Sequence, residues 1–232
     1  MPYHTQESND AVILQPKSPP TAAVIWLHGL GADGYDFVPI VEELQLPSQM
    51  AVRFVFPHAP RRPVTINNGY VMRAWYDILS LDLTGREDAA GVRDSEIIVR
   101  RFIDAEIAAG IATNRIVVAG FSQGGAMALH AGLRYPEPLA GILALSTYLP
   151  LRDTFEREAT AANRDTPILM CHGSHDQVVP ELAGRLSYEH LKGLGYQVEW
   201  KSYPMAHQVC MEEIADVSAW LQRRLKSVGR EL

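Results

Sequence analysis

The chain has 232 residues, of which 47% are hydrophobic and 21% are charged, a composition too apolar for intrinsic disorder and typical of a globular protein. Lys and Arg number 21 against 27 Asp and Glu, a net charge of −6, so we expect neither nucleic acid nor an anionic membrane as a partner. Two cysteines are too few for a disulfide framework and fit a reducing compartment. The polar N-terminus lacks the features of a signal peptide, and no apolar run approaches the about 20 residues of a spanning helix. We therefore expect a cytoplasmic protein without stable membrane insertion.

Short apolar, β-branched runs recur along the chain and predict strands buried on both faces of a sheet. After a polar N-terminal tail, these runs occupy residues 22–27, 51–56, 115–119, 140–145, 166–171 and 197–203. Stripes of apolar side chains at helical spacing lie between them, in 92–107, 123–134, 180–194 and 211–226. Strands that alternate with helices predict one α/β domain over residues 1–232, a doubly wound, mostly parallel sheet with helices on both faces.

Residues 58–90 interrupt this alternation. The segment has no sustained period, yet it contains several large apolar side chains, Trp75 and Tyr76 among them. Two interpretations stay open: a surface hairpin that covers the core, or an apolar wall over a binding cleft. Because nearly every other residue is already assigned to the sheet or its helices, we expect no large lid domain.

The strongest chemical signal is the segment Gly120-Phe121-Ser122-Gln123-Gly124, which follows one predicted strand and opens the predicted helix 123–134. A nucleophile elbow requires a strand, a sharp turn that strains the serine, and a helix, with small residues two positions before and after the serine. The N-terminus of the helix also places backbone N–H groups and partial positive charge where an oxyanion would form. The alternative is a glycine-rich packing turn without chemistry.

A serine hydroxyl becomes a good nucleophile only when a base takes its proton, so a carboxylate and a histidine should follow downstream in that order. Asp176 follows the predicted strand 166–171, and His207 follows the predicted strand 197–203, each on a loop before a helix. Asp153 and Asp165 fit helix caps or solvated charges better. We therefore predict Ser122, Asp176 and His207 as the catalytic triad.

The other histidines fit structural roles better. His28, His58 and His172 each end a strand, where a ring can satisfy loop carbonyls. The grouping of His172, His175 and Asp176 is weak evidence for a metal site, because one loop carries all three and no separated further ligand is evident. We expect neither a metal ion nor a cofactor.

A tetrahedral intermediate needs a second oxyanion donor, normally from the loop after an earlier strand. The strand 22–27 leads into His28-Gly29-Leu30-Gly31, whose glycines let the backbone turn an N–H inward. We predict the N–H groups of Leu30 and Gln123 as the oxyanion hole; a plain glycine-rich connection is the alternative. An apolar groove for the acyl chain, open on one side, is expected from Leu30, Trp75, Leu149 and Leu151.

Four motifs together resemble the carboxylesterase/acyl-protein thioesterase family of α/β-hydrolases, its small bacterial carboxylesterases above all. The motifs are His28-Gly29-Leu30-Gly31, Gly120-Phe121-Ser122-Gln123-Gly124-Gly125-Ala126, His172-Gly173-x-x-Asp176-x-x-Val179-Pro180 and Met205-x-His207. The likeness covers nearly the whole chain. It implies the α/β-hydrolase fold, the same triad and oxyanion donors, an open apolar groove, no cofactor and frequently a homodimer. The implied substrates are acyl esters and sometimes thioesters or lysophospholipids.

Two positions depart from the family pattern. Ala206 stands where the family often has glycine, and it would be strained if that position requires a positive φ. Gln208-Val209-Cys210 replaces the Ser-Ser-Cys of the animal thioesterases, which favours ester hydrolysis over protein deacylation. We therefore predict a carboxylesterase that cleaves short- to medium-chain acyl esters through an acyl-enzyme on Ser122. An acyl-protein or acyl-CoA thioesterase or lysophospholipase with the same triad, and a catalytically silent binding protein on this scaffold, are the alternatives.

Overall fold

The computed structural model describes residues 3–80 and 86–226. The strands are β1 (Tyr3–Glu7), β2 (Ala11–Pro16), β3 (Ala22–Leu27), β4 (Val52–Pro57), β5 (Arg61–Val64), β6 (Tyr70–Arg73), β7 (Ile116–Phe121), β8 (Gly141–Leu145), β9 (Ile168–Gly173) and β10 (Val198–Tyr203). The α-helices are α1 (Ile40–Glu43), α2 (Ala89–Ala108), α3 (Gln123–Arg134), α4 (Arg152–Glu158), α5 (Glu181–Gly193) and α6 (Met211–Leu225). None of the helices in these ranges is long and apolar enough to cross a membrane.

The described strands form one large sheet and a separate hairpin. The large sheet has the order β1-β2-β4-β3-β7-β8-β9-β10, with antiparallel pairing at β1–β2 and β2–β4 and parallel pairing from β4 to β10. Parallel strands end at the same edge of a sheet, so the loops after β3, β7, β9 and β10 meet at one edge. The predicted doubly wound, mostly parallel sheet is confirmed.

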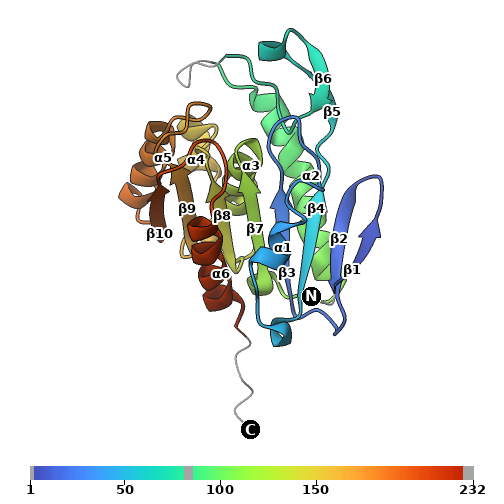
Figure 1. Ribbon diagram of the computed structural model, residues 1–232. Coiled ribbons are helices and arrows are strands. Elements are labelled where there is room, and N and C mark those ends of the chain that lie inside the picture. Colours follow the sequence, from blue (N-terminus) through green and yellow to red (C-terminus); the bar gives the residue numbers. More distant parts are fainter. Residues whose placement is uncertain (1–2, 81–85, 227–232) are drawn as a thin grey trace.

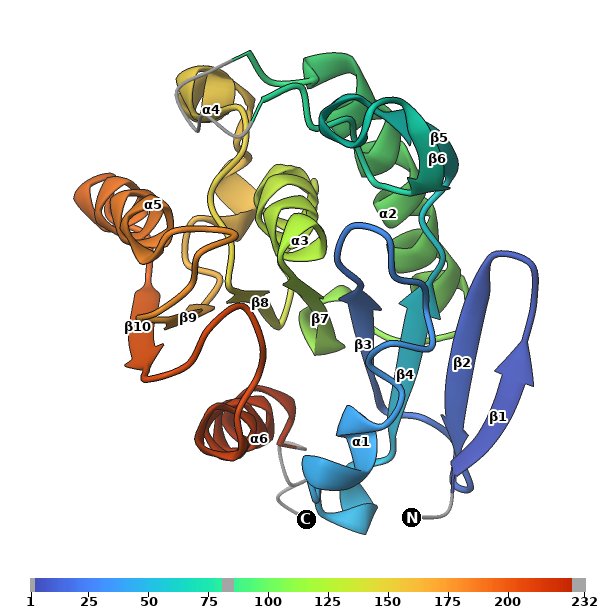
Figure 2. The same ribbon diagram turned by 45° about the horizontal axis from the view of Figure 1, so that its top comes forward.

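Helices cover both faces of the sheet. Figure 2 shows α2, α3 and α5 on one face and α1 and α6 on the other, and a buried apolar cluster lies under each set. The side chains of β3 alternate between the two clusters: Ala23, Ile25 and Leu27 join one, and Ala22, Val24 and Trp26 join the other. This strand is therefore buried on both faces, which explains its unbroken apolar sequence.

The polar N-terminal segment contains a strand that the sequence pattern does not predict. Residues Tyr3–Glu7 form β1, an edge strand that pairs with β2 from Tyr3 opposite Pro16 to Glu7 opposite Val12. Four of its five residues are exposed, and only Tyr3 packs on the core, with its ring centroid 5.9 Å from that of Phe54. Apart from Tyr3, the strand is held by backbone pairing and carries no apolar pattern. A sequence pattern based on burial does not detect such a strand.

The long segment after β4 contains both a hairpin and buried apolar residues. β5 and β6 pair antiparallel, from Arg61 opposite Arg73 to Val64 opposite Tyr70, and stand above the carboxyl edge of the sheet (Figure 1). The chain then enters the core, where Trp75 is fully buried and Tyr76 is 3% exposed. Of the predicted 58–90 loop, residues 81–85 lie outside the described residues.

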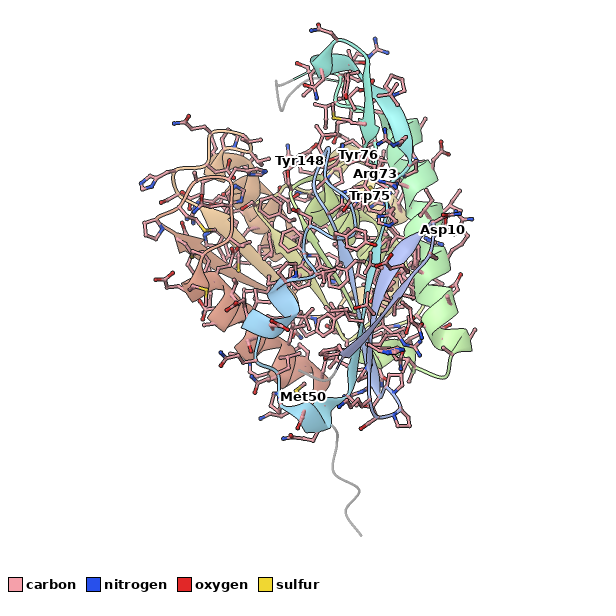
Figure 3. The ribbon with its side chains drawn as sticks, turned by 45° about the vertical axis from the view of Figure 1, so that its right-hand side comes forward. Asp10, Met50, Arg73, Trp75, Tyr76 and Tyr148 are labelled. Carbon is pink, nitrogen blue, oxygen red and sulfur yellow. The ribbon has the colours of Figure 1, made fainter. Side chains whose placement is uncertain are left out.

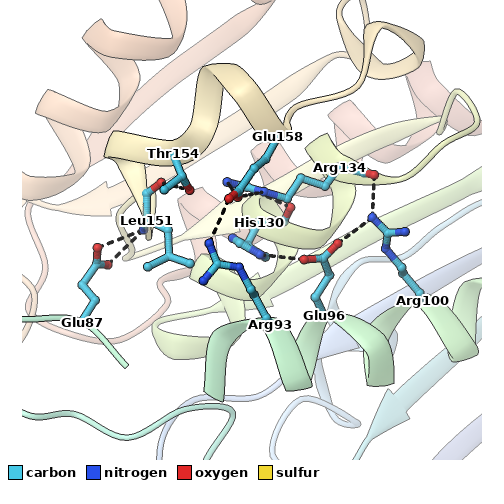
Figure 4. Close-up of polar contacts among 9 residues, drawn as sticks. All are labelled: Glu87, Arg93, Glu96, Arg100, His130, Arg134, Leu151, Thr154 and Glu158. Carbon is cyan, nitrogen blue, oxygen red and sulfur yellow. Dashed lines mark hydrogen bonds and ion pairs between the residues drawn. The ribbon is translucent and has the colours of Figure 1, made fainter. Parts of the chain in front are cut away.

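A hydrogen bond and an ion pair connect α3 to the neighbouring helices α2 and α4 (Figure 4). On α2, Glu96 lies 2.9 Å from the Nε2 atom of the fully buried His130 and 2.6 Å from Arg100. Arg134, at the end of α3, pairs with Glu158 of α4 at 2.9 Å. Burial lowers the pKa of His130, which favours the neutral ring that donates to Glu96. The helix that follows Ser122 is thus anchored on two sides.

Candidate active site

Ser122 occupies a strained turn between β7 and α3. Its φ of 54° and ψ of −121° lie in a backbone region that residues other than glycine rarely adopt. The Ser122 N–H donates to the Leu145 carbonyl at 2.8 Å, and the Thr147 hydroxyl donates to the Ser122 carbonyl at 2.7 Å. These two contacts to the end of β8 hold the turn in place.

Two glycines allow this turn to form. A Cβ atom on Gly120 would lie 2.2 Å from the Gly124 carbonyl oxygen, and a Cβ on Gly124 would lie 2.2 Å from the Leu27 carbonyl oxygen. Both neighbours are backbone atoms that cannot move aside. The glycines therefore let β7, α3 and β3 approach closely, as an elbow requires.

The structure brings the three predicted triad residues together. His207 Nε2 lies 2.9 Å from Ser122 Oγ, and His207 Nδ1 lies 2.6 Å from Asp176 Oδ2. The other oxygen of Asp176 accepts the N–H groups of Val178 and Val179 at 2.8 and 2.9 Å. Because a carboxylate accepts from Nδ1, the proton of a neutral His207 sits there, and Nε2 is left to accept the Ser122 hydroxyl.

The remaining polar residues of the acid loop have separate roles. His172 is buried, stacks on Trp200 and donates from Nε2 to the Val179 carbonyl at 2.8 Å. Burial lowers its pKa, and its 3.6 Å separation from Asp176 is too long for a hydrogen bond. His175 is exposed. Within residues 3–80 and 86–226, no group of three or more His, Cys, Asp or Glu side chains is arranged to hold a metal ion.

Ala206, the departure before His207, causes no backbone strain. It is absent from the described non-glycine residues that have a positive φ. The backbone around Ala206 approaches another segment closely at Gly173, where an added Cβ would lie 2.4 Å from the Ala206 carbonyl oxygen. The loop therefore accepts the methyl group of Ala206.

The predicted oxyanion donors lie beside the serine. Gln123 N is the first amide of α3, and a Cβ on Gly29, next to Leu30, would lie 3.5 Å from Ser122 Cβ. In the part of the chain that the structure describes, neither the Leu30 N–H nor the Gln123 N–H donates to a protein acceptor. Gly31, with a φ of 78°, donates to the Arg73 carbonyl at 2.9 Å, which fixes the loop that carries Leu30.

His28 supports the same loop from beneath, a role that its sequence pattern does not reveal. Its Nε2 accepts the Ala59 N–H at 3.0 Å, so the proton of the ring is on Nδ1, which donates to the Gly29 carbonyl at 2.7 Å. The ring is 1% exposed, and burial lowers its pKa to about 4. His28 is therefore neutral, and both ring nitrogens position the loop that carries Leu30.

The prediction that Trp75 lines an open groove is wrong. Its indole is fully buried, and Nε1 donates to the His28 carbonyl at 2.9 Å. The side chain of Gln123 accepts a hydrogen bond from the backbone N–H of Trp75 at 2.8 Å and donates one to the backbone carbonyl of Tyr76 at 2.7 Å. The hydroxyl of Tyr76, the residue after Trp75, lies 3.0 Å from that of Tyr148 (Figure 3). Trp75 thus joins the long loop to the oxyanion loop.

The other predicted groove residues are also largely covered. Leu149 and Leu151 are 4% and 7% exposed, and Leu30 is half-buried. Of the four residues predicted to line the acyl groove, only Leu30 has a substantially exposed side chain. Leu149 and Leu151 leave little surface for an acyl chain to contact.

An elbow serine after a central parallel strand, with the acid and the base after later strands, defines a protein of the α/β-hydrolase class. Residues 8–225 match the phospholipase/carboxylesterase family, and the chain belongs to it and is a hydrolase. The chain is 45% identical over 214 residues to acyl-protein thioesterase 1 of Gibberella zeae. The aligned region covers 88% of this chain and 91% of that protein.

Solved structures show the same likeness. Arabidopsis thaliana SOBER1 superposes with a TM-score of 0.84 at 34% identity, over 88% of this chain and 99% of that one. Zea mays acyl-protein thioesterase 2 gives a TM-score of 0.83 at 32% identity, over 93% and 98%. Both superpositions include nearly the whole length of the relative. The resemblance to the carboxylesterase/acyl-protein thioesterase family that the motifs indicated is therefore confirmed.

Proposed function

We propose that this protein hydrolyses acyl thioesters and acyl esters through an acyl-enzyme on Ser122, with S-acylated protein cysteines as the preferred substrates. The observation that carries this proposal is the unbroken chain from Asp176 through His207 to Ser122, with distances of 2.6 and 2.9 Å. The preference for thioesters draws on relatives called acyl-protein thioesterase 1, among them the Gibberella zeae protein. It reverses the order expected from Gln208-Val209-Cys210.

In the proposed reaction, Ser122 Oγ bonds to the carbonyl carbon while its proton passes to His207 Nε2. Asp176 keeps the ring oriented and stabilises the imidazolium. The N–H groups of Leu30 and Gln123 donate to the oxyanion. When the bond to the leaving sulfur or oxygen breaks, His207 returns the proton to that atom, and water then releases the acid by the same steps.

Ester hydrolysis with short- to medium-chain acyl groups is the second candidate. The family that the chain matches is described as phospholipase/carboxylesterase, and the chemistry of the two candidates differs only in the leaving atom. The same Ser122, His207 and Asp176 would serve both.

The deciding experiment compares a thioester and an oxygen ester that share one acyl chain. We expect a higher kcat/KM for the thioester in the intact protein, loss of both activities in Ser122→Ala, and labelling of Ser122 by a fluorophosphonate. Ser174→Ala is the matched control, because its hydroxyl lies on the acid loop and contacts the Tyr203 carbonyl at 3.1 Å, away from the nucleophile. A higher kcat/KM for the ester would favour the carboxylesterase, and an unlabelled, inactive protein would favour a silent scaffold.

The homodimer that the family resemblance implies stays a prediction. Sedimentation of the full chain at several concentrations measures it directly. A single species of 25.7 kDa at every concentration would contradict the dimer.

A further inference from the structure

A pocket of about 370 Å³ has His207 in its lining, together with residues of α1 and α6. These two helices cover one face of the sheet (Figure 2). Its apolar lining comes from Phe37, Ile40, Phe121, Val209 and Ile214. We call it the His207-side pocket. The rings of Phe121 and His207 are in contact, with centroids 4.7 Å apart, so the pocket is continuous with the catalytic histidine.

The position of this pocket matches the path of the leaving group. A tetrahedral intermediate on Ser122 carries the serine oxygen, the oxyanion, the acyl chain and the leaving group. The oxyanion is directed to Leu30 and Gln123, and the leaving atom must come within hydrogen-bond reach of His207 Nε2 to receive its proton. The part of the substrate beyond that atom therefore lies on the His207 side of the intermediate.

The lining that the structure describes also contains two carboxylates and no Lys or Arg. Asp36 and Glu43 contribute to its lining. Segments 18–52 and 202–222, which supply all of the lining except Phe121, contain no Lys or Arg. Among the described residues, no Lys or Arg forms an ion pair with either carboxylate. Burial, and to a smaller extent the neighbouring Asp33, raise the pKa of Asp36.

We propose that the His207-side pocket binds the leaving group and favours a thiol with apolar substituents next to the scissile bond and positive charge beyond them. A cysteine within a basic segment of an S-acylated protein has this chemistry. The apolar lining would hold the residues beside the cysteine, and Asp36 and Glu43 would attract the basic side chains. This inference rests on the proposed function and names the part of the substrate that the acyl chain does not determine.

The test uses three octanoyl thioesters whose leaving thiols differ in charge: thiocholine (positive), 2-mercaptoethanol (neutral) and 3-mercaptopropionate (negative). Because these thiols also differ in size and acidity, each kcat/KM is divided by the rate constant for hydroxide hydrolysis of the same thioester before the values are compared. We expect kcat/KM to fall in that order, by about two- to ten-fold at each step at low salt, and the steps to shrink as salt screens the carboxylates. In the double variant Asp36→Asn/Glu43→Gln, the ratio of thiocholine to 2-mercaptoethanol should fall toward one.

Glu42→Gln is the matched control, because Glu42 is an exposed carboxylate on the same short helix that does not line the pocket. This variant should keep the ratio of the intact protein. Equal kcat/KM values for all three thioesters, or a ratio that Asp36→Asn/Glu43→Gln leaves as it was, would overturn the inference. Hydrolysis of none of the three would overturn the proposed function instead, so the two failures are distinguishable.

A second variant tests the apolar lining. Val209→Trp places a bulky ring in the pocket from the half-buried Val209. It should lower kcat/KM for an S-octanoyl peptide with apolar residues beside its cysteine more than for the 2-mercaptoethanol thioester. Labelling of Ser122 by a fluorophosphonate shows that the site is still formed, and an equal loss for both substrates would contradict the assignment.

Discussion

Gln123 connects the helix behind the nucleophile to Trp75. Its Oε1 accepts the backbone N–H of Trp75 at 2.8 Å, and its Nε2 donates to the backbone carbonyl of Tyr76. Trp75 in turn donates to the carbonyl of His28, at the start of the oxyanion loop. One side chain therefore links the elbow, the long loop and the loop that carries Leu30.

Replacing Gln123 by leucine should destabilise the fold. The variant leaves the Trp75 N–H and the Tyr76 carbonyl buried without partners, at about 1–3 kcal/mol for each group. Denaturant unfolding measures the loss. Gln177→Leu, at an exposed position on the acid loop, should change the free energy of unfolding by less than about 0.5 kcal/mol. Equal stability of the two variants would show that the Gln123 linkage contributes nothing.

The stability of the protein should fall as the pH drops from about 6.5 toward 4, partly because of His28. Burial lowers its pKa from 6.5 to about 4, so the unfolded chain binds a proton in this range while the folded ring does not. His28 therefore lowers the free energy of unfolding as the pH falls. The loss is absent well above the pKa of His28 in the unfolded chain and reaches roughly 3 kcal/mol once the pH is below its pKa in the folded protein. Unfolding of the intact protein between pH 4 and 7 measures the slope.

His28→Gln keeps an acceptor for the Ala59 N–H but cannot titrate in this range. The variant should be less stable at pH 7 and should show a shallower dependence on pH. The same slope in both proteins would mean that other groups cause it.

Ser122→Ala and His207→Ala should each lower kcat by on the order of 10⁴ or more, because each removes an obligatory partner from one proton relay. The double variant should be about as slow as either single variant, since the losses fall on the same step. His175→Ala is the control: this histidine is exposed on the acid loop and should retain nearly full activity. More than about a tenth of the activity in Ser122→Ala would reject the nucleophile.

Gly124→Ala and Gly193→Ala should have opposite effects on stability. At Gly124 a Cβ would meet backbone oxygens at 2.2 and 2.6 Å, so β3 and α3 must separate and the elbow must deform. At Gly193, near the end of α5, nothing lies within 4 Å of the added Cβ, and alanine should raise the free energy of unfolding by up to about 1 kcal/mol. Thermal unfolding compares them, and a Gly124→Ala protein of unchanged stability would contradict the close packing.

Much of this protein can be predicted from local pattern. The strand 22–27 and the helix 123–134 have the predicted bounds, because a strand buried on both faces is continuously apolar and a helix after an elbow begins at a defined residue. Ser122, Asp176 and His207 could be selected because parallel strands end at one edge, so chain order and position after a strand already bring them near each other.

Tertiary structure decided the features that depend on a particular neighbour. Trp75 is apolar and lies in a long loop, which suits a groove wall as well as a core residue, and only the carbonyl of His28 and the amide of Gln123 place it inside. The tautomer of His28 likewise depends on the Ala59 N–H, 31 residues away. β1 has no apolar pattern because only Tyr3 of its residues packs on the core, and backbone pairing with β2 holds the rest. A sequence records the burial of a side chain through its composition, but a hydrogen bond between distant segments has no such signature.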